Sequence, residues 1–137
     1  RRRTGLRMRS GLLALALSLA LPAAAQTLLT PDEFLDRAES RTLTFEDWPA
    51  GGLVGVEEFL SRQHSRWVHA DGHCTRGQIT VEAPYVCFRY EDDPGRAHCW
   101  LPFNYEGKLL VQSPEGNVQM VTEVTRRPLI CGDAPIS

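Results

Sequence analysis

The stretch HCTRGQITVEAPYVCFRYEDDPGRAHCW, residues 73–100, decides the fold because it holds three of the four cysteines and a strong hairpin pattern. A hairpin with a three-residue loop at 92–94 puts Cys87 directly opposite Cys99. Their Cα atoms are then about 4.5–5.5 Å apart, which suits a disulfide. A slip of one residue would instead place Cys87 opposite Trp100 and prevent this bond.

The other two cysteines, Cys74 and Cys131, then form a second pair that ties the C-terminal segment to the sheet. An even number of cysteines in an exported chain favours disulfides over free thiols. We therefore predict the disulfides Cys87–Cys99 and Cys74–Cys131.

The first residues predict export. A cluster of arginines precedes an apolar run over 11–21, and small residues follow before Gln26, which is the three-part pattern of a secretory signal. We predict a signal peptide over 1–25, with Met8 as an alternative start, and one β-rich domain over 26–137. The apolar run is shorter than the roughly 20 residues that a membrane-spanning helix needs. The sequence thus predicts a periplasmic or secreted protein with no membrane anchor after signal cleavage.

Removing the predicted signal changes the charge balance. The remaining 112 residues keep ten basic and 17 acidic side chains, a net charge of −7. Binding to phosphate backbones needs a basic surface. We therefore expect no nucleic-acid partner and no attraction to an anionic membrane.

The pattern of the mature chain is mainly β. Thr30 and Glu33 form a capping box that predicts a helix over 31–39, and short strands joined by turns follow. The predicted fold class is α+β, mainly β: a short N-terminal helix packed on a strongly curved or closed antiparallel meander of 7–8 strands with two disulfides. The predicted strands are Thr42–Glu46, Gly55–Leu60, Ser65–Ala70, His73–Glu82, Tyr85–Glu91, His98–Glu106, Lys108–Gln112 and Val118–Thr125.

Three histidines near Cys74 raise the question of a metal site. A two-residue turn at 71–72 puts His69 and His73 on opposite faces of the sheet, and His64 lies far along the strand. Zinc spacing of the C-x₂₋₄-C type is absent from the sequence. We predict no metal ligands and no cofactor.

No catalytic residue is predicted either. The sequence has no G-x-S-x-G motif, and each His-Cys pair points to two faces of a strand. The adjacent carboxylates Glu57 and Glu58 are likewise split between the two faces of a strand.

The aromatic residues give the one local indication of binding. In the hairpin register, Val86 and Trp100 share one face, while Tyr85 shares the other with the paired cysteines. One face must be core, and the other is either covered or a partly exposed aromatic surface. The candidate binding residues are Trp67, Tyr85, Tyr90 and Trp100. Pro102 removes a ladder donor, which predicts a strand edge or a bulge there.

The cysteine arrangement, together with CFRYEDDPGRAHCW at 87–100 and EGKLLV at 106–111, resembles small uncharacterised exported proteins of Gram-negative bacteria. These proteins are grouped as domains of unknown function. The resemblance implies a signal peptide, a β-rich body and paired cysteines, and it implies no activity.

The expected function is a non-catalytic binding module for an unknown protein or small ligand. Two alternatives stay open at this point: an envelope enzyme or metal-binding protein that uses the His and Cys residues, and a structural envelope component.

Overall fold

The structure is a computed structural model that describes residues 4–5, 11, 14–16 and 26–131. The predicted signal peptide therefore lies almost wholly outside the described residues. Within them, no helix is both long and apolar enough to cross a membrane.

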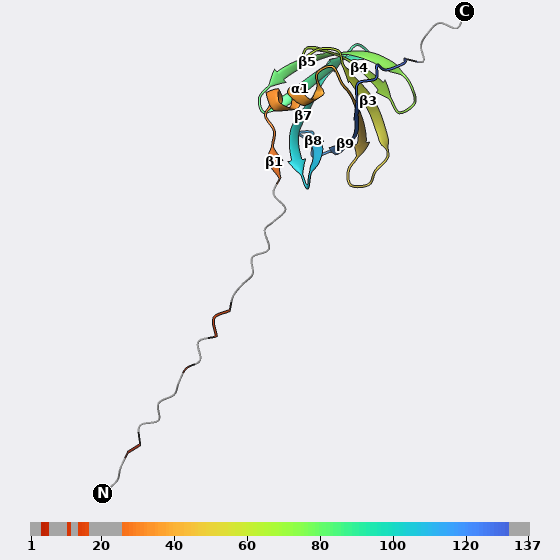
Figure 1. The fold of residues 1–137 in the computed structure, drawn as a ribbon. Coiled ribbons are helices and arrows are strands. Elements are labelled where there is room, and N and C mark those ends of the chain that lie inside the picture. Colours follow the sequence, from red (N-terminus) through yellow and green to blue (C-terminus); the bar gives the residue numbers. More distant parts are fainter. Residues whose placement is uncertain (1–3, 6–10, 12–13, 17–25, 132–137) are drawn as a thin grey trace, which may run out of the picture.

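Eight antiparallel strands close into a barrel, and a ninth short strand extends the sheet beside one of them. Figure 1 shows the curved wall of the barrel. Strands β2 to β9 run up and down in sequence order, and β9 returns to pair with β2, from Thr42 opposite Thr125 to Asp47 opposite Gln119. The short strand β1 pairs with the end of β7. The strands are β1 Thr27–Leu28, β2 Thr42–Asp47, β3 Leu53–Phe59, β4 His64–His69, β5 Cys74–Glu82, β6 Tyr85–Tyr90, β7 Asp93–Tyr105, β8 Lys108–Gln112 and β9 Val118–Thr125. The prediction of a curved or closed meander is confirmed.

The helix α1, Pro31–Ala38, begins at the predicted capping box. The Thr30 hydroxyl accepts from the backbone N–H of Glu33, and the Glu33 carboxylate accepts from the backbone N–H of Thr30. Pro31 occupies the first turn, where its missing N–H has no intrahelical partner to lose.

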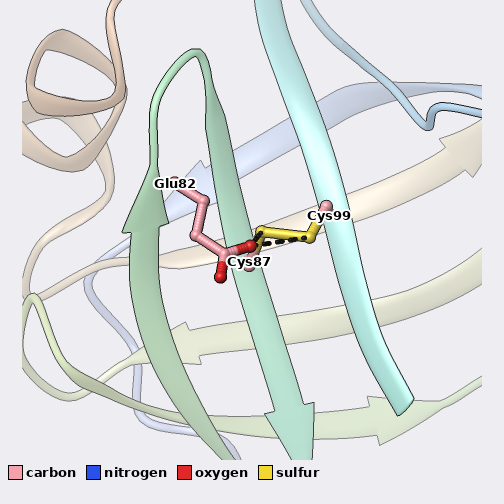
Figure 2. A group of neighbouring side chains, drawn as sticks. All are labelled: Glu82, Cys87 and Cys99. Atoms are coloured by element: carbon pink, nitrogen blue, oxygen red, sulfur yellow. Dashed lines mark hydrogen bonds between the residues drawn. A yellow bond between two sulfur atoms is a disulfide. The ribbon is translucent and has the colours of Figure 1, made fainter.

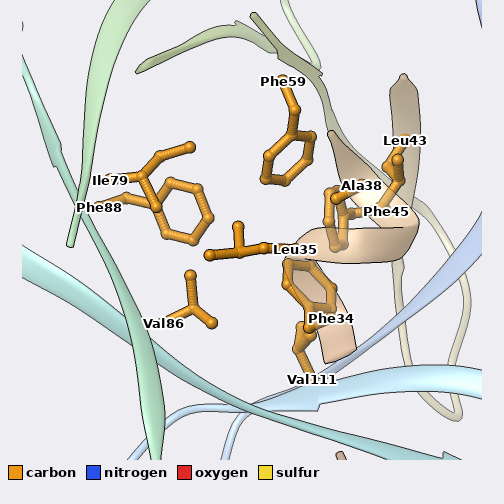
Figure 3. Close-up of a cluster of buried hydrophobic side chains, with 10 residues drawn as sticks. All are labelled: Phe34, Leu35, Ala38, Leu43, Phe45, Phe59, Ile79, Val86, Phe88 and Val111. Atoms are coloured by element: carbon orange, nitrogen blue, oxygen red, sulfur yellow. The ribbon is translucent and has the colours of Figure 1, made fainter. Parts of the chain in front are cut away.

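One face of α1 packs into the barrel core. Phe34, Leu35 and Ala38 are buried there, and the ring of Phe34 meets Phe59 edge to face at 5.9 Å. Figure 3 shows this cluster around the helix. Its ten buried members are Phe34, Leu35, Ala38, Leu43, Phe45, Phe59, Ile79, Val86, Phe88 and Val111.

The outer face of α1 is joined to the β3–β4 turn. The Arg62 guanidinium contacts the carboxylates of Asp32 at 3.1 Å, Asp36 at 2.8 Å and Glu39 at 3.4 Å. These exposed pairs are weak individually, but together they fix the helix at the end of the barrel where β4 begins.

Both predicted disulfides are present. Cys87 faces Cys99 across the β6–β7 ladder, and Cys74 bonds Cys131. Such bonds persist in oxidising surroundings and are rare in the cytosol, so they indicate a compartment outside the cytoplasm.

The loop of the β6–β7 hairpin differs from the prediction. Tyr90 pairs with Asp93, so the tight turn is Glu91-Asp92 rather than a three-residue loop at 92–94. The extra residues form an irregularity in β7, and the register recovers at Phe88 opposite His98. The cysteines therefore face each other as predicted, although the turn lies elsewhere.

Pro102 is not at a strand edge, contrary to the prediction. It is buried and pairs with Val111 of β8. Its carbonyl accepts from the N–H of Leu29, so its own nitrogen also points away from β8. The missing N–H therefore removes no bond from the β7–β8 ladder.

Candidate functional site

The barrel encloses a cavity of about 320 Å³, within the range of small-ligand sites. The helix covers the end where β4 begins. At the other end of β4 the partly exposed side chains of His69 and Asp92 mark an opening to solvent. The lining residues come from α1, from every barrel strand except β5, and from the β6–β7 turn, which contributes Asp92. They are Phe34, Phe45, Val54, Glu57, Trp67, His69, Val86, Phe88, Tyr90, Asp92, Asp93, His98, Trp100, Pro102, Val111 and Gln119.

Glu57 is the unusual member of this lining because its side chain is only 1% exposed. Strand alternation points Glu57 inward with Gly55 and Phe59, and the intervening Glu58 points outward. On the outer face Glu58 accepts from the backbone N–H of Leu129 at 3.3 Å. The predicted split of the two carboxylates is thus confirmed.

The two oxygens of the Glu57 carboxyl differ in their contacts. Oε1 accepts from the Ser65 hydroxyl at 3.0 Å and from the Tyr90 hydroxyl at 2.9 Å. Oε2 is buried and has no hydrogen-bond partner. Oε1 therefore has two hydrogen-bond donors, while Oε2 has none, in a side chain that lines the cavity.

Burial sets the protonation of this carboxyl. Desolvation raises the pKa of Glu57 to about 8, and the hydrogen bonds from Tyr90 and Ser65 oppose part of the rise. Burial and the neighbouring charge of Glu57 also raise the pKa of Tyr90 well above its usual value. At pH 7, Glu57 is therefore mostly a neutral acid, and Tyr90 is a neutral donor.

A glycine makes this arrangement possible. Gly77 lies between Ser65 and Tyr90 on the neighbouring strands, and a Cβ atom there would run into the Ser65 hydroxyl and the Tyr90 ring. Without a side chain at position 77, Tyr90 can lean across β5 toward Glu57. Gly55 gives similar room to the Trp67 ring.

Aromatic rings form most of the wall beside Glu57. Trp67 is the direct cross-strand neighbour of Glu57. Its ring lies 6.3 Å from Tyr90 and 6.1 Å from Phe45, and Phe88 stacks on Tyr90 at 6.1 Å, all between ring centroids. Glu57 and these rings thus line the same cavity.

The opening is edged by imidazoles and carboxylates. His69 Nε2 lies 2.9 Å from Asp92 Oδ2, and His73 Nε2 lies 3.9 Å from the same oxygen. His98 Nε2 lies 3.4 Å from Asp93 Oδ2. These groups are partly exposed, so they meet a ligand before Glu57 does.

The prediction that His69 and His73 point to opposite faces is wrong. Val68 pairs with Cys74, so the loop has three residues, 70–72, and His69 faces His73 directly. Their rings stack at 5.7 Å between centroids. One additional loop residue is enough to bring both side chains to the same face.

The sulfur atoms lie on the outside of the barrel wall. Figure 2 shows Glu82 beside the Cys87–Cys99 bond, with its Oε2 atom 3.1 Å from Cys87 Sγ and 3.7 Å from Cys99 Sγ. A disulfide sulfur carries no hydrogen to donate, and it offers no thiolate to a metal. Glu82, Cys87 and Cys99 bring three potential ligand atoms within 4.8 Å of one another, but the two sulfurs are bonded in a cystine.

Three of the four predicted binding residues, Trp67, Tyr90 and Trp100, line the cavity. Tyr85 is not part of the lining, because it alternates with the inward-facing Val86. The sequence reasoning missed the role of Glu57. The signal that could have found it is the inward series Gly55, Glu57 and Phe59, in which one carboxylate replaces an apolar residue.

No family model, curated protein or solved structure matches the chain.

Proposed function

We propose that this protein is a non-catalytic binding protein, periplasmic or secreted, that holds a small and largely apolar molecule inside its barrel. The observation that carries the proposal is the aromatic cavity of about 320 Å³ with the unpartnered Oε2 atom of Glu57 in its wall. An apolar pocket with a few convergent polar groups is the usual form of a small-molecule site.

The placement of the polar groups supports binding rather than covalent chemistry. All four cysteines are in disulfides, so none supplies a nucleophile. The export expected from the sequence agrees with the oxidising compartment that the disulfides indicate.

The test is titration of the protein with the uncharged fluorescent probe N-phenyl-1-naphthylamine. We expect saturable binding of one probe per chain, because the aromatic walls exclude water from it. Val54→Phe adds a ring at a lining position and should weaken binding at least tenfold. Val81→Phe makes the same change at a half-exposed position outside the cavity and should leave binding unchanged.

Two outcomes would overturn the proposal. One is the absence of saturable binding by the folded wild-type protein. The other is equal binding by the Val54→Phe and Val81→Phe variants, once circular dichroism has shown that both are folded, because the probe would then bind elsewhere.

A further inference from the structure

The charges around the cavity limit the class of ligand. This inference rests on the proposed function. The ionisable groups in the lining are the carboxyls of Glu57, Asp92 and Asp93, the imidazoles of His69 and His98, and the phenol of Tyr90. None of the described lining residues is Lys or Arg, so an anionic head group has no permanent cation to meet. Acidic groups at the opening instead attract a cation.

The polar contacts of Glu57 also favour a cationic ligand. The donors on Oε1, from Ser65 and Tyr90, stabilise the charged form of the carboxyl, and only burial opposes it. A third donor on Oε2 would complete the contacts of a carboxylate. An ammonium group supplies that donor together with the compensating charge, which a buried carboxylate requires.

The neighbouring rings favour a cation at the same place. Trp67 is paired across the strands with Glu57, and Tyr90 bonds to it directly. A cation within about 6 Å of a ring centroid is attracted by the ring face, most strongly for Trp. A neutral ligand would gain the apolar contacts without this attraction.

We propose that the barrel takes a small apolar amine whose ammonium group donates to Oε2 of Glu57 beside the rings of Trp67 and Tyr90. The amine arrives protonated, as alkyl ammonium groups are at neutral pH. On binding, Glu57 releases its carboxyl proton to solvent, and the amine keeps its own protons, so an ammonium–carboxylate pair forms. Binding therefore releases one proton for each Glu57 that was protonated beforehand.

The rival ligand is a neutral molecule with a hydrogen-bond acceptor. Protonated Glu57 could donate from Oε2 to a carbonyl or hydroxyl oxygen. Such binding releases no proton and weakens when Glu57 ionises. The two classes thus predict opposite pH dependences, and a matched pair of probes separates them.

The experiment compares 2-phenylethylamine with 2-phenylethanol by isothermal titration calorimetry in phosphate and MOPS, two buffers with different ionisation enthalpies. At pH 8 the amine should bind at least tenfold more tightly than the alcohol. At pH 7 it should release about 0.9 proton, the fraction of Glu57 that is protonated when its pKa is about 8. Its affinity should rise roughly ninefold from pH 6 to pH 7 and about fivefold more to pH 8, and it should level off above pH 8.

Two variants identify the group that releases the proton. Glu57→Gln keeps the shape of the side chain and should reduce amine affinity to that of the alcohol, without proton release. Glu58→Gln makes the same change on the outer face of β3 and should behave as the wild type. Any release from His69, His98 or the Asp groups at the opening would persist in Glu57→Gln, so the difference isolates Glu57.

Each outcome bears on a different claim. Equal or tighter binding of the alcohol, or equal amine affinity in Glu57→Gln, overturns the amine assignment and leaves the cavity as a binding site. Failure of the amine, the alcohol and N-phenyl-1-naphthylamine to bind the folded protein overturns the proposed function itself.

Discussion

At the scale of the residue, burial of Glu57 inside the barrel destabilises the folded state. Its pKa of about 8 lies well above the ordinary value of 4.5. Folding at pH 7 must therefore protonate a carboxyl that is ionised in the unfolded chain, which costs roughly 3 kcal/mol at 1.36 kcal/mol per pH unit. A hydrophobic residue at position 57 would avoid this cost, so the carboxyl is a candidate for a functional group.

The cost has a defined pH dependence. Below pH 4.5 Glu57 is protonated in both the folded and unfolded states, and it costs nothing. The penalty grows as pH rises from 4.5 to 8 and is complete above 8, so stability falls with rising pH in this window. We expect the free energy of unfolding of the wild type to fall by roughly 3 kcal/mol from pH 5 to pH 8, relative to Glu57→Gln.

Urea unfolding followed by tryptophan fluorescence measures this difference. Glu58→Gln is the control and should keep the wild-type pH profile. Parallel pH profiles for the wild type and Glu57→Gln would show that Glu57 ionises normally in the folded protein.

At the scale of the element, α1 acts as part of the core rather than as a surface addition. Leu35 is buried against the barrel interior, whereas Leu60, in the β3–β4 turn, is half exposed. Leu35→Ala should lower the free energy of unfolding by about 2–5 kcal/mol, because it leaves a cavity in the core. Leu60→Ala should cost less than about 1 kcal/mol.

Chemical denaturation of both variants checks this expectation. Equal costs would mean that the helix docks loosely and that its apolar face contributes little to stability.

Local sequence patterns predicted the elements well and their loops less well. The capping box at Thr30 and the alternation in each strand are local, so α1 and the eight barrel strands lie close to their predicted positions. The loops at 70–72 and 91–92 were misjudged by one residue each, because several loop lengths fit the same turn residues. In the first case that error reversed the face assigned to His73.

At the scale of the whole molecule, the two disulfides close loops of very different size. Cys74 and Cys131 are 57 residues apart, and Cys87 and Cys99 are 12 apart. From the loop entropy of the unfolded chain, replacing the first pair by serine should cost about 4 kcal/mol and replacing the second about 3 kcal/mol.

Equilibrium unfolding of the two double-serine variants tests this order. Intact-mass analysis of the wild type should show four hydrogens fewer than the fully reduced chain. A larger loss from the Cys87–Cys99 pair would indicate that packing around this cystine outweighs loop entropy.

The cavity itself could not be predicted from the sequence, because it depends on closure of the sheet. Glu57, Ser65 and Tyr90 come from three strands, β3, β4 and β6, and they meet only when the wall curves. Alternation shows that Glu57 and Glu58 face opposite ways, but it does not show which face is enclosed. Trp67, Tyr90 and Trp100 were predicted as binding residues because they are aromatic. The sequence did not show that they line the same cavity.

The pairing of β2 with β9 also determines when the barrel can be completed. It joins residues 42–47 to residues 119–125, so the seam stays open until nearly the whole domain has been synthesised. Until then β2 exposes an unpaired edge, a known starting point for aggregation. The ladder that closes this barrel can consequently form only late in synthesis, when β9 becomes available to the waiting edge of β2.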